Sequence, residues 1–358
     1  MKTERCTTIA QFRGKIIMHA RLNEVVKEIR TVCRDLAEAG ENQKIIVVCG
    51  PAGAGKTTAQ KIEEKLILKN AAAEMAKDPA YFPAVEVCVD KAAEARSVWK
   101  QFWQDLLGGF SDVLIENKSL PQARAKGLRQ VSGRESTEAL RLAVRNQVMH
   151  RRTGYLFVDE AQHLLTKGQG RTEKDNLDVL KSLVAKFRVL CILAGPYELK
   201  TLVALDGQLI RRVRFIHFSA YGQGKKDHKD FYDTVRQMEA LLPLPFADDV
   251  KVETLFEGTL GCVGLLKDWM VLAAQRAINS SAKKIHQADF LQTMLSGEDL
   301  TTLATEIAMG EAAFSERNGV RKNIREFLGL PEEPEAKAPA KPRKFSPGIR
   351  HPRRDPLG

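Results

Sequence analysis

The sequence predicts an α/β fold in which a parallel five-stranded sheet is flanked by helices and followed by a small helical domain. Two observations support this fold class. Short, nearly continuous apolar runs alternate with segments of helical apolar spacing, which is typical of strands buried on both faces. After about residue 222 only helical patterns continue. The predicted strands span residues 45–49, 84–90, 155–159, 189–194 and 213–218.

The helical segments define the expected domain organisation. Apolar residues at helical spacing predict helices that include residues 21–39, 58–69, 227–242, 252–257, 263–279 and 287–295. Half of the 14 prolines lie after residue 330, among many basic residues, which indicates a disordered tail. Whether this tail has a partner stays open. We therefore expect a flexible N-terminus at 1–15, an α/β core at 16–222, a helical lid at 223–300, and a C-terminal helix with a disordered basic tail at 301–358.

Composition narrows the range of partners. The 358 residues include 56 lysines and arginines against 45 acidic residues, a net charge of +11 that favours a polyanionic partner such as nucleic acid. No stretch approaches the roughly 20 apolar residues that span a bilayer, so we expect no membrane partner. The six cysteines lack C-x-x-C spacing, which argues against a zinc site and favours a reducing, cytoplasmic location.

A phosphate-binding motif follows the first predicted strand. Residues 50–57 read Gly-Pro-Ala-Gly-Ala-Gly-Lys-Thr, which is G-x-x-x-x-G-K-T, the P-loop or Walker A motif. Its glycines let backbone N–H groups turn inward, and with the next helix N-terminus they cradle phosphate oxygens. We expect Lys56 to contact the β- and γ-phosphates and Thr57 to ligate Mg²⁺. The candidate ATP-binding residues here are Gly50, Pro51, Ala52, Gly53, Ala54, Gly55, Lys56, Thr57 and Thr58.

Two carboxylates end the third predicted strand. Gly154-Tyr-Leu-Phe-Val leads into Asp159 and Glu160, which is the Walker B pattern. Asp159 is expected to hold Mg²⁺ together with Thr57. Glu160 is placed to act as the general base that activates water. A kinase that transfers phosphate to a bound substrate needs no such base, so this second carboxylate favours hydrolysis. The sequence therefore predicts ATP hydrolysis.

These motifs resemble a known family. A P-loop sheet with a helical lid is similar to an AAA+ ATPase, and Asp159-Glu-Ala-Gln-His-Leu164 resembles the D-E-A-x-x-L of the TnsC and TniB transposition regulators of Tn7-like elements, and more distantly MuB. The resemblance implies assembly with ATP as a ring or helical filament on duplex DNA, between a target-selection protein and a transposase. His19-Ala-Arg-Leu-Asn-Glu24 resembles the stretch that closes over adenine in this branch, which makes Arg21 a candidate cofactor-binding residue.

The resemblance also implies contacts from outside the Walker motifs. Arg211 and Arg212, before the fifth strand, resemble the arginine finger that reaches the neighbouring subunit's ATP; the alternative is an ordinary basic turn. Lys267 resembles the sensor-2 residue, and its alternative is a solvated lysine. The family often carries a polar sensor-1 residue after the fourth strand. Here Gly195 and Pro196 stand instead, so we expect slow hydrolysis.

Candidate DNA contacts are basic residues without base-reading partners, as backbone-directed binding requires. We expect them after the second strand and in the insertion before the third, although each residue alone could be a solvated charge. They are Lys91, Arg96, Lys118, Arg124, Lys126 and Arg129. Trp99, Phe102 and Trp103 could stack on bases or pack in the core.

Two other functions stay open. An initiator or loader ATPase of DNA replication shares the same ATP site, but such proteins often add a winged-helix domain, for which residues 301–358 are too short and proline-rich. A signalling or secretion-associated ATPase that does not act on DNA would not need the basic charge. The sequence leaves open the number of subunits, the identity of the partners and the rate of hydrolysis.

Overall fold

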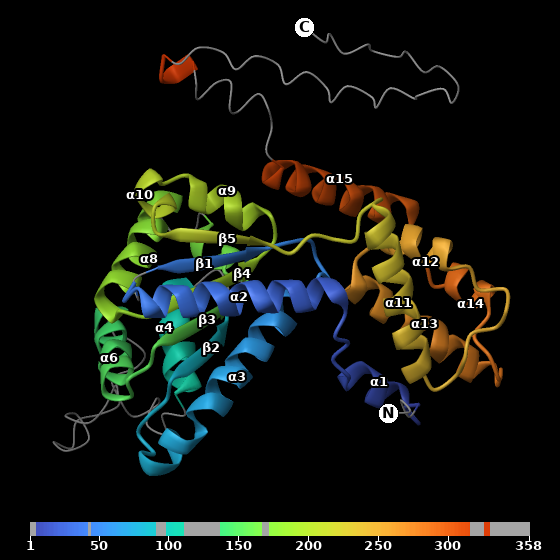
Figure 1. Cartoon of the computed structure of the whole chain (residues 1–358), viewed down its shortest axis with the longest axis horizontal. Helices are drawn as coiled ribbons and strands as arrows, with labels where there is room; N and C mark the ends of the chain where they lie inside the picture. Colours follow the sequence, from blue (N-terminus) through green and yellow to red (C-terminus); the bar gives the residue numbers. More distant parts are fainter. Residues whose placement is uncertain are drawn as a thin grey trace, which may run out of the picture. The chain divides into compact units, whose positions relative to one another are not determined.

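The computed structural model describes residues 5–41, 44–90, 98–110, 137–166, 172–315 and 326–329. The described strands form one five-stranded parallel sheet with the order β2-β3-β4-β1-β5, which confirms the predicted fold class (Figure 1). They are β1 (Ile45–Cys49), β2 (Ala84–Cys88), β3 (Tyr155–Asp159), β4 (Leu190–Gly195) and β5 (Val213–His217).

The position of β4 matters most for the site. β4 lies between β1 and β3, with Cys49 paired to Gly195 and Val158 paired to Leu193. Because all three strands are parallel, their carboxyl ends meet at one edge of the sheet. Ligands of open α/β sheets bind outside this edge. We therefore expect the ligand-binding and catalytic residues in the loops that follow β1, β3 and β4.

Helices bury both faces of the sheet. On one face α2 (Ala20–Glu38) and α3 (Lys56–Lys77) pack over Ile46, Phe157 and Ile192. The alternate strand residues, such as Val47 and Leu193, point to the other face and are equally buried. The remaining helices of this region are α4 (Val98–Gly109), α6 (Thr137–His150), α7 (Gln162–Leu165), α8 (Glu173–Phe187), α9 (Glu198–Ala204) and α10 (Gly207–Ile210).

The aromatic residues of α4 belong to the core. Trp99, Phe102 and Trp103 are each no more than 2 % exposed and contact one another at ring-centroid distances of 5.0–5.8 Å. The indole N–H of Trp99 donates to Asn176 Oδ1 (2.9 Å), which satisfies its buried polar group. These three aromatic side chains therefore pack in the core, and they are too buried to stack on bases.

The helical region after residue 222 has its own hydrophobic cluster. Phe231, Met238, Leu266, Trp269 and Phe290 are at its centre. The helices are α11 (Lys225–Leu241), α12 (Val252–Thr259), α13 (Val263–Asn279), α14 (Gln287–Leu291) and α15 (Gly297–Phe314). None of the helices in the described ranges combines the length and apolar character that a membrane crossing requires.

The start of the chain differs from the expected flexible N-terminus. In the described part of residues 1–15, α1 (Ile9–Gly14) packs against α13, and Phe12 is fully buried in the helical cluster. Thr8 caps α1, and the Cys6 N–H donates to Leu241 O (3.0 Å). A six-residue helix shows too little periodicity to be read from sequence, so tertiary burial of one aromatic ring decides its structure. The predicted tail from residue 331 lies outside the described residues.

Candidate nucleotide-binding site

The P-loop joins β1 to α3 at the carboxyl edge of the sheet. Gly53 (φ +72°) and Gly55 (φ +105°) adopt left-handed conformations that favour glycine. Gly50 needs glycine for another reason, because a Cβ there would lie 2.2 Å from the carbonyl oxygen of Phe218. The chain thus turns tightly around the N-terminus of α3, which begins at Lys56. This is the geometry of a backbone phosphate cradle.

Lys56 is folded back onto the loop. Its Nζ donates to the carbonyl oxygens of Gly50 (2.9 Å) and Pro51 (2.8 Å), and the residue is 9 % exposed. Burial lowers the pKa of Lys56, while the nearby carboxylates of Glu160 and Asp159 raise it. A buried ammonium held beside two carboxylates and two carbonyls is ready to exchange those carbonyls for phosphate oxygens.

Thr57 and Asp159 lie together across the gap between α3 and β3. The Thr57 hydroxyl donates to Asp159 Oδ2 (2.6 Å), and the other carboxylate oxygen accepts from the Glu160 N–H (3.0 Å). Asp159 is 5 % exposed, as the last residue of a buried strand. A hydroxyl and a carboxylate at this distance are the hard oxygen ligands that Mg²⁺ accepts when phosphate and water supply the rest. The residues therefore fit the ion.

Glu160 has an unusual backbone conformation. Its φ of +52° lies in the left-handed region, which costs a residue with a Cβ on the order of 1 kcal/mol. The following N–H, that of Ala161, donates to Ala194 O (2.9 Å), which fixes the turn to the end of β4. The Glu160 side chain accepts a hydrogen bond from Gln162 Nε2 (2.6 Å). Strain of this kind persists where the surroundings hold it, as at active sites.

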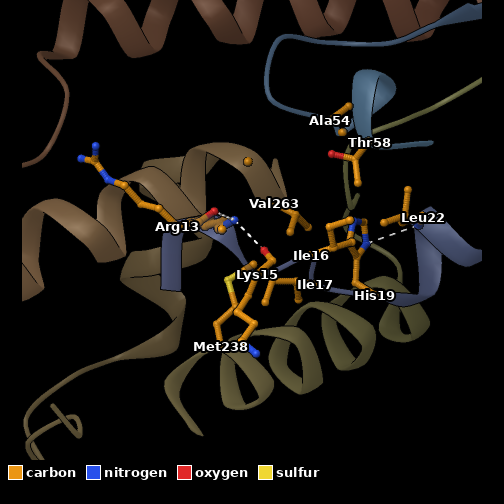
Figure 2. Close-up of a pocket in the computed structure, with 14 residues that line it drawn as sticks. Arg13, Lys15, Ile16, Ile17, His19, Leu22, Ala54, Thr58, Met238 and Val263 are labelled. Carbon is orange, nitrogen blue, oxygen red and sulfur yellow. Dashed lines mark hydrogen bonds between the residues drawn. The ribbon is translucent and has the colours of Figure 1, made fainter. Parts of the chain in front are cut away.

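A pocket of about 220 Å³ opens beside the P-loop (Figure 2). Ala54, Gly55 and Thr58 of the phosphate loop line one side, and Val263, Gly264 and Lys267 at the start of α13 line another. The end of α1 (Arg13 and Gly14) and the segment between α1 and α2 (Lys15, Ile16, Ile17 and His19) complete it, together with Leu22 and Met238. We call this cavity the α13 pocket. Its lining combines apolar side chains such as Ile17 and Val263 with polar groups, which suits a heterocyclic base attached to a phosphate chain.

Direct contact joins the P-loop to α13. The Gly264 N–H donates to the carbonyl oxygen of Gly53 (2.7 Å). A Cβ at Gly264 would lie 2.3 Å from that oxygen, so this close approach requires glycine. The first turn of α13 is therefore placed against the phosphate loop.

His19 enters the α13 pocket from the N-terminus of α2. Its Nδ1 accepts from the Leu22 N–H (3.4 Å) and lies 3.0 Å from the Tyr221 hydroxyl, which in turn accepts from the Arg21 N–H (3.1 Å). Burial, and secondarily the charge of Arg21, lowers the pKa of His19 to about 4. His19 is therefore a neutral ring at physiological pH, stabilising the entry into α2.

Arg21 and Lys267, both predicted to bind the cofactor, have protein partners. The Arg21 guanidinium donates to both carboxylate oxygens of Asp227 (3.1 Å each), and Arg21 is not among the residues lining the α13 pocket. Lys267 does line the pocket. Its Nζ donates to the carbonyls of Arg13 and Lys15 (2.7 Å each), and burial lowers its pKa. Lys267 is thus bonded to backbone carbonyls in this structure, and its role toward the nucleotide stays a prediction.

Arg211 and Arg212 lie at the opposite edge of the sheet from the P-loop. They directly precede β5, whose first residue, Val213, pairs with Ile45 at the start of β1. The strand rise of about 3.3 Å per residue places them more than about 15 Å from the phosphate loop of the same chain. They cannot serve their own ATP site, so a finger role requires a neighbouring subunit.

The predicted DNA contacts cannot be compared with the structure, and two residues near the nucleotide site were not predicted. The candidate DNA contacts Lys91, Arg96, Lys118, Arg124, Lys126 and Arg129 lie outside the described residues. Sequence reasoning missed Gln162, which contacts Glu160, although it stands inside the quoted D-E-A-Q-H-L run. It also missed Tyr221. A lone tyrosine after the fifth strand carries no signal of its contact with a residue 202 positions earlier.

Known proteins share this architecture. Residues 37–203 match the family model of the AAA domain. The ORC2 protein of Aeropyrum pernix in its ADP form has 16% identity and a TM-score of 0.52, over 79% of this chain and 70% of that one. The ORC1 protein of the same organism, in complex with DNA, has 15% identity and a TM-score of 0.51, over 77% of this chain and 65% of that one. No curated protein matches the sequence. Residues 37–203 are therefore similar to the AAA domain, and the chain is an ATPase with the AAA+ P-loop fold.

Proposed function

We propose that this ATPase is a nucleotide-controlled protein that assembles on duplex DNA and regulates transposition. The observation that supports its ATP-dependent part is the cluster of Lys56, Thr57, Asp159 and Glu160 at the meeting edge of β1, β3 and β4. ADP and ADPNP–ADP forms exist of the Aeropyrum pernix ORC2 protein, which shares the fold. The base and ribose would occupy the α13 pocket, and the phosphates the P-loop.

In the proposed reaction each residue of the cluster has one task. Lys56 leaves the Gly50 and Pro51 carbonyls and binds the β- and γ-phosphates of ATP. Thr57 and Asp159 would hold Mg²⁺, which when bound neutralises charge on the phosphates. Glu160 accepts a proton from water as the water oxygen bonds to the γ-phosphorus. The bond from that phosphorus to the β–γ bridging oxygen breaks, which yields ADP and inorganic phosphate.

The position of Arg211 and Arg212 supports the proposal that several copies assemble. Since they are too far from the ATP site of their own chain, we propose that they reach the γ-phosphate of a neighbouring subunit in a ring or helical filament. A guanidinium there stabilises charge that develops on the transferred phosphoryl group. ATP would then hold subunits together, and hydrolysis would release them.

The proposed DNA partner rests on charge and on likeness. The net charge of +11 favours a polyanion, and the Aeropyrum pernix ORC1 protein, which has the same fold, was solved in complex with DNA. The candidate contacts are Lys91, Arg96, Lys118, Arg124, Lys126 and Arg129. They would bind phosphates rather than base edges, so binding should be largely independent of sequence.

The transposition role rests on the D-E-A-x-x-L resemblance and implies a transposase and a target-selection protein as partners. A second candidate, an initiator or loader of replication, is favoured by the fold similarity to the two ORC proteins. Electron microscopy of the chain on unrelated duplexes with ATP separates the two. Rings or filaments on every duplex support the regulator, whereas one protected site on a particular sequence supports the initiator.

Duplex binding itself is tested by gel shift with ATP, with ADP and without nucleotide. We expect a shift that is strongest with ATP, and an affinity that falls steeply with salt by about 0.9 in log–log slope for each phosphate neutralised. Arg124→Ala/Lys126→Ala/Arg129→Ala should flatten that slope while ATP binding stays intact. No shift in any nucleotide state would overturn the DNA role and favour an ATPase that does not act on DNA.

A further inference from the structure

Gln162 is held in a fixed position between the ends of β3 and β4. It begins α7, directly after the Ala161 N–H that donates to Ala194 O, and Leu164 and Leu165 anchor the same short helix in the core. The residue is 7 % exposed. Its backbone therefore has little freedom, and its side chain must point into the space beside the carboxyl edge of the sheet.

The amide of Gln162 faces Glu160 in one orientation only. Nε2 donates to Glu160 Oε2 (2.6 Å), whereas the flipped amide would place its oxygen against the carboxylate oxygen. The remaining atom, Oε1, is buried and accepts no hydrogen bond from the described residues. A buried amide oxygen without a donor is unfavourable, so a group kept in this state calls for an explanation.

Gln162 Oε1 lies directly beside Gly195, the last residue of β4. A Cβ added at Gly195 would lie 2.7 Å from Gln162 Oε1, and 3.0 Å from Leu199 Cδ2. A Cβ at position 195 would therefore require the end of the Gln162 side chain to shift away. The amide of Gln162 thus occupies the space that a side chain at the end of β4 would need. Since β4 lies between the P-loop strand and the Asp159 strand, this space lies at the edge where the proposed function places the phosphates.

We infer that Gln162 is a positioning residue that orients the Glu160 carboxylate for ATP hydrolysis. The absence of a side chain at Gly195 leaves the space that the Gln162 amide occupies. The inference deepens the proposed function, since it rests on Glu160 as the base. With Oε2 held by the amide, the carboxylate presents its other oxygen to the attacking water. The polar group at the end of β4 is supplied from α7, three residues after Asp159, and not from the strand itself.

Four full-length variants test this: Gln162→Ala, Gln162→Met, Gly195→Ala and the double variant Gln162→Ala/Gly195→Ala. We expect kcat for ATP to fall about 10–100-fold in each, the scale of a misplaced catalytic group, with KM and ATP affinity nearly unchanged. Gly195→Ala should displace the amide sterically, so the double variant should be no slower than Gln162→Ala alone. Gln162→Met keeps the side-chain volume and separates loss of the hydrogen bond from loss of packing.

Gln60→Met is the matched control. Gln60 is also a buried glutamine with an unpaired Oε1, and its Nε2 donates to the carbonyls of Val158 (3.3 Å) and Ile192 (2.9 Å), not to a carboxylate. It should change the unfolding midpoint without the kcat loss. Wild-type kcat in both Gln162 variants, or additive losses in the double variant, would overturn the inference. Absence of hydrolysis by the wild-type chain would instead overturn the proposed catalytic roles.

Discussion

Two lysines of the nucleotide site make the same kind of contact over very different distances along the chain. Lys56 donates to the carbonyls of Gly50 and Pro51, and Lys267 donates to those of Arg13 and Lys15. Burial lowers the pKa of both. The first contact lies inside one eight-residue motif, whereas the second joins residues 252 and 254 positions apart.

We expect the ammonium of Lys56 to move when ATP binds and that of Lys267 to stay in place. Lys56 has the carboxylates of Glu160 and Asp159 nearby and belongs to a loop built for phosphate, so we expect its amine to change partners when ATP binds. Lys267 holds the end of α1 and the residue after it against α13, which shapes the pocket beside the P-loop. We propose that Lys56 binds the nucleotide and that Lys267 maintains the shape of the α13 pocket.

The largest expected effect is that of Lys56→Ala. The phosphate loop loses its buried cation, so ATP binding should fall below detection, and ATP-dependent DNA assembly should be lost with it. Nucleotide titration and gel shift measure the two. Normal ATP-dependent assembly by this variant would sink the phosphate-loop assignment.

Lys267→Met is the matched variant at the other lysine. It keeps the hydrophobic stem and removes the donors to Arg13 and Lys15. ATP binding should weaken only several-fold, because the wall loosens while the phosphate cradle stays intact. A loss as complete as that of Lys56→Ala would mean that Lys267 contacts the nucleotide directly and is not only a structural residue.

The arginine pair tests whether catalysis crosses between subunits. Arg211→Ala/Arg212→Ala should reduce hydrolysis by about 10³-fold or more, as for a lost arginine finger, while nucleotide binding remains. Mixing these subunits with Lys56→Ala subunits should restore part of the activity at mixed interfaces. A steady-state phosphate assay across mixing ratios measures this, and no recovery at any ratio counts against action in trans if assembly is seen to persist.

A smaller effect is expected on stability as pH changes. The pKa of His19, about 4, lies below the ordinary value of 6.5. Between these values the unfolded chain binds a proton that the native chain excludes, so the free energy of unfolding falls as pH drops from about 6.5 to 4. The total is on the order of 3 kcal/mol.

His19→Asn provides the comparison for that pH dependence. Asparagine also caps helix N-termini but does not titrate. Denaturant melts at pH 7 and pH 4.5 should therefore show a smaller drop in the variant than in the wild-type chain. An equal drop in both proteins would assign the pH dependence to other groups.

The sequence predicts the sheet and the phosphate edge because both depend on local signals. Apolar runs mark the buried strands, and P-loop glycines, Lys56, Thr57, Asp159 and Glu160 stand directly at strand ends. The predicted bounds of the first and third strands match the structure. The helix predicted at 58–69 runs from Lys56 to Lys77, because no glycine or proline interrupts it before Asp78 and Pro79.

What the sequence does not predict depends on long-range contacts. The burial of Phe12, the bonds of Lys267 and the contact between His19 and Tyr221 join segments about 200 or more residues apart. Gln162 is different, since it lies near Glu160 in sequence. Its proposed role in orienting Glu160 depends on the position of β4 between β1 and β3, which brings Gly195 against the Gln162 amide.

Glu160 is proposed to remove a proton from water at a site that binds ATP independently of it. Single-turnover hydrolysis and nucleotide titration of Glu160→Gln test this most directly. We predict wild-type ATP and Mg²⁺ binding, with hydrolysis slower by about 10²–10⁴-fold, the usual contribution of a general base. Phosphate release at the wild-type rate would show that Glu160 is not the general base.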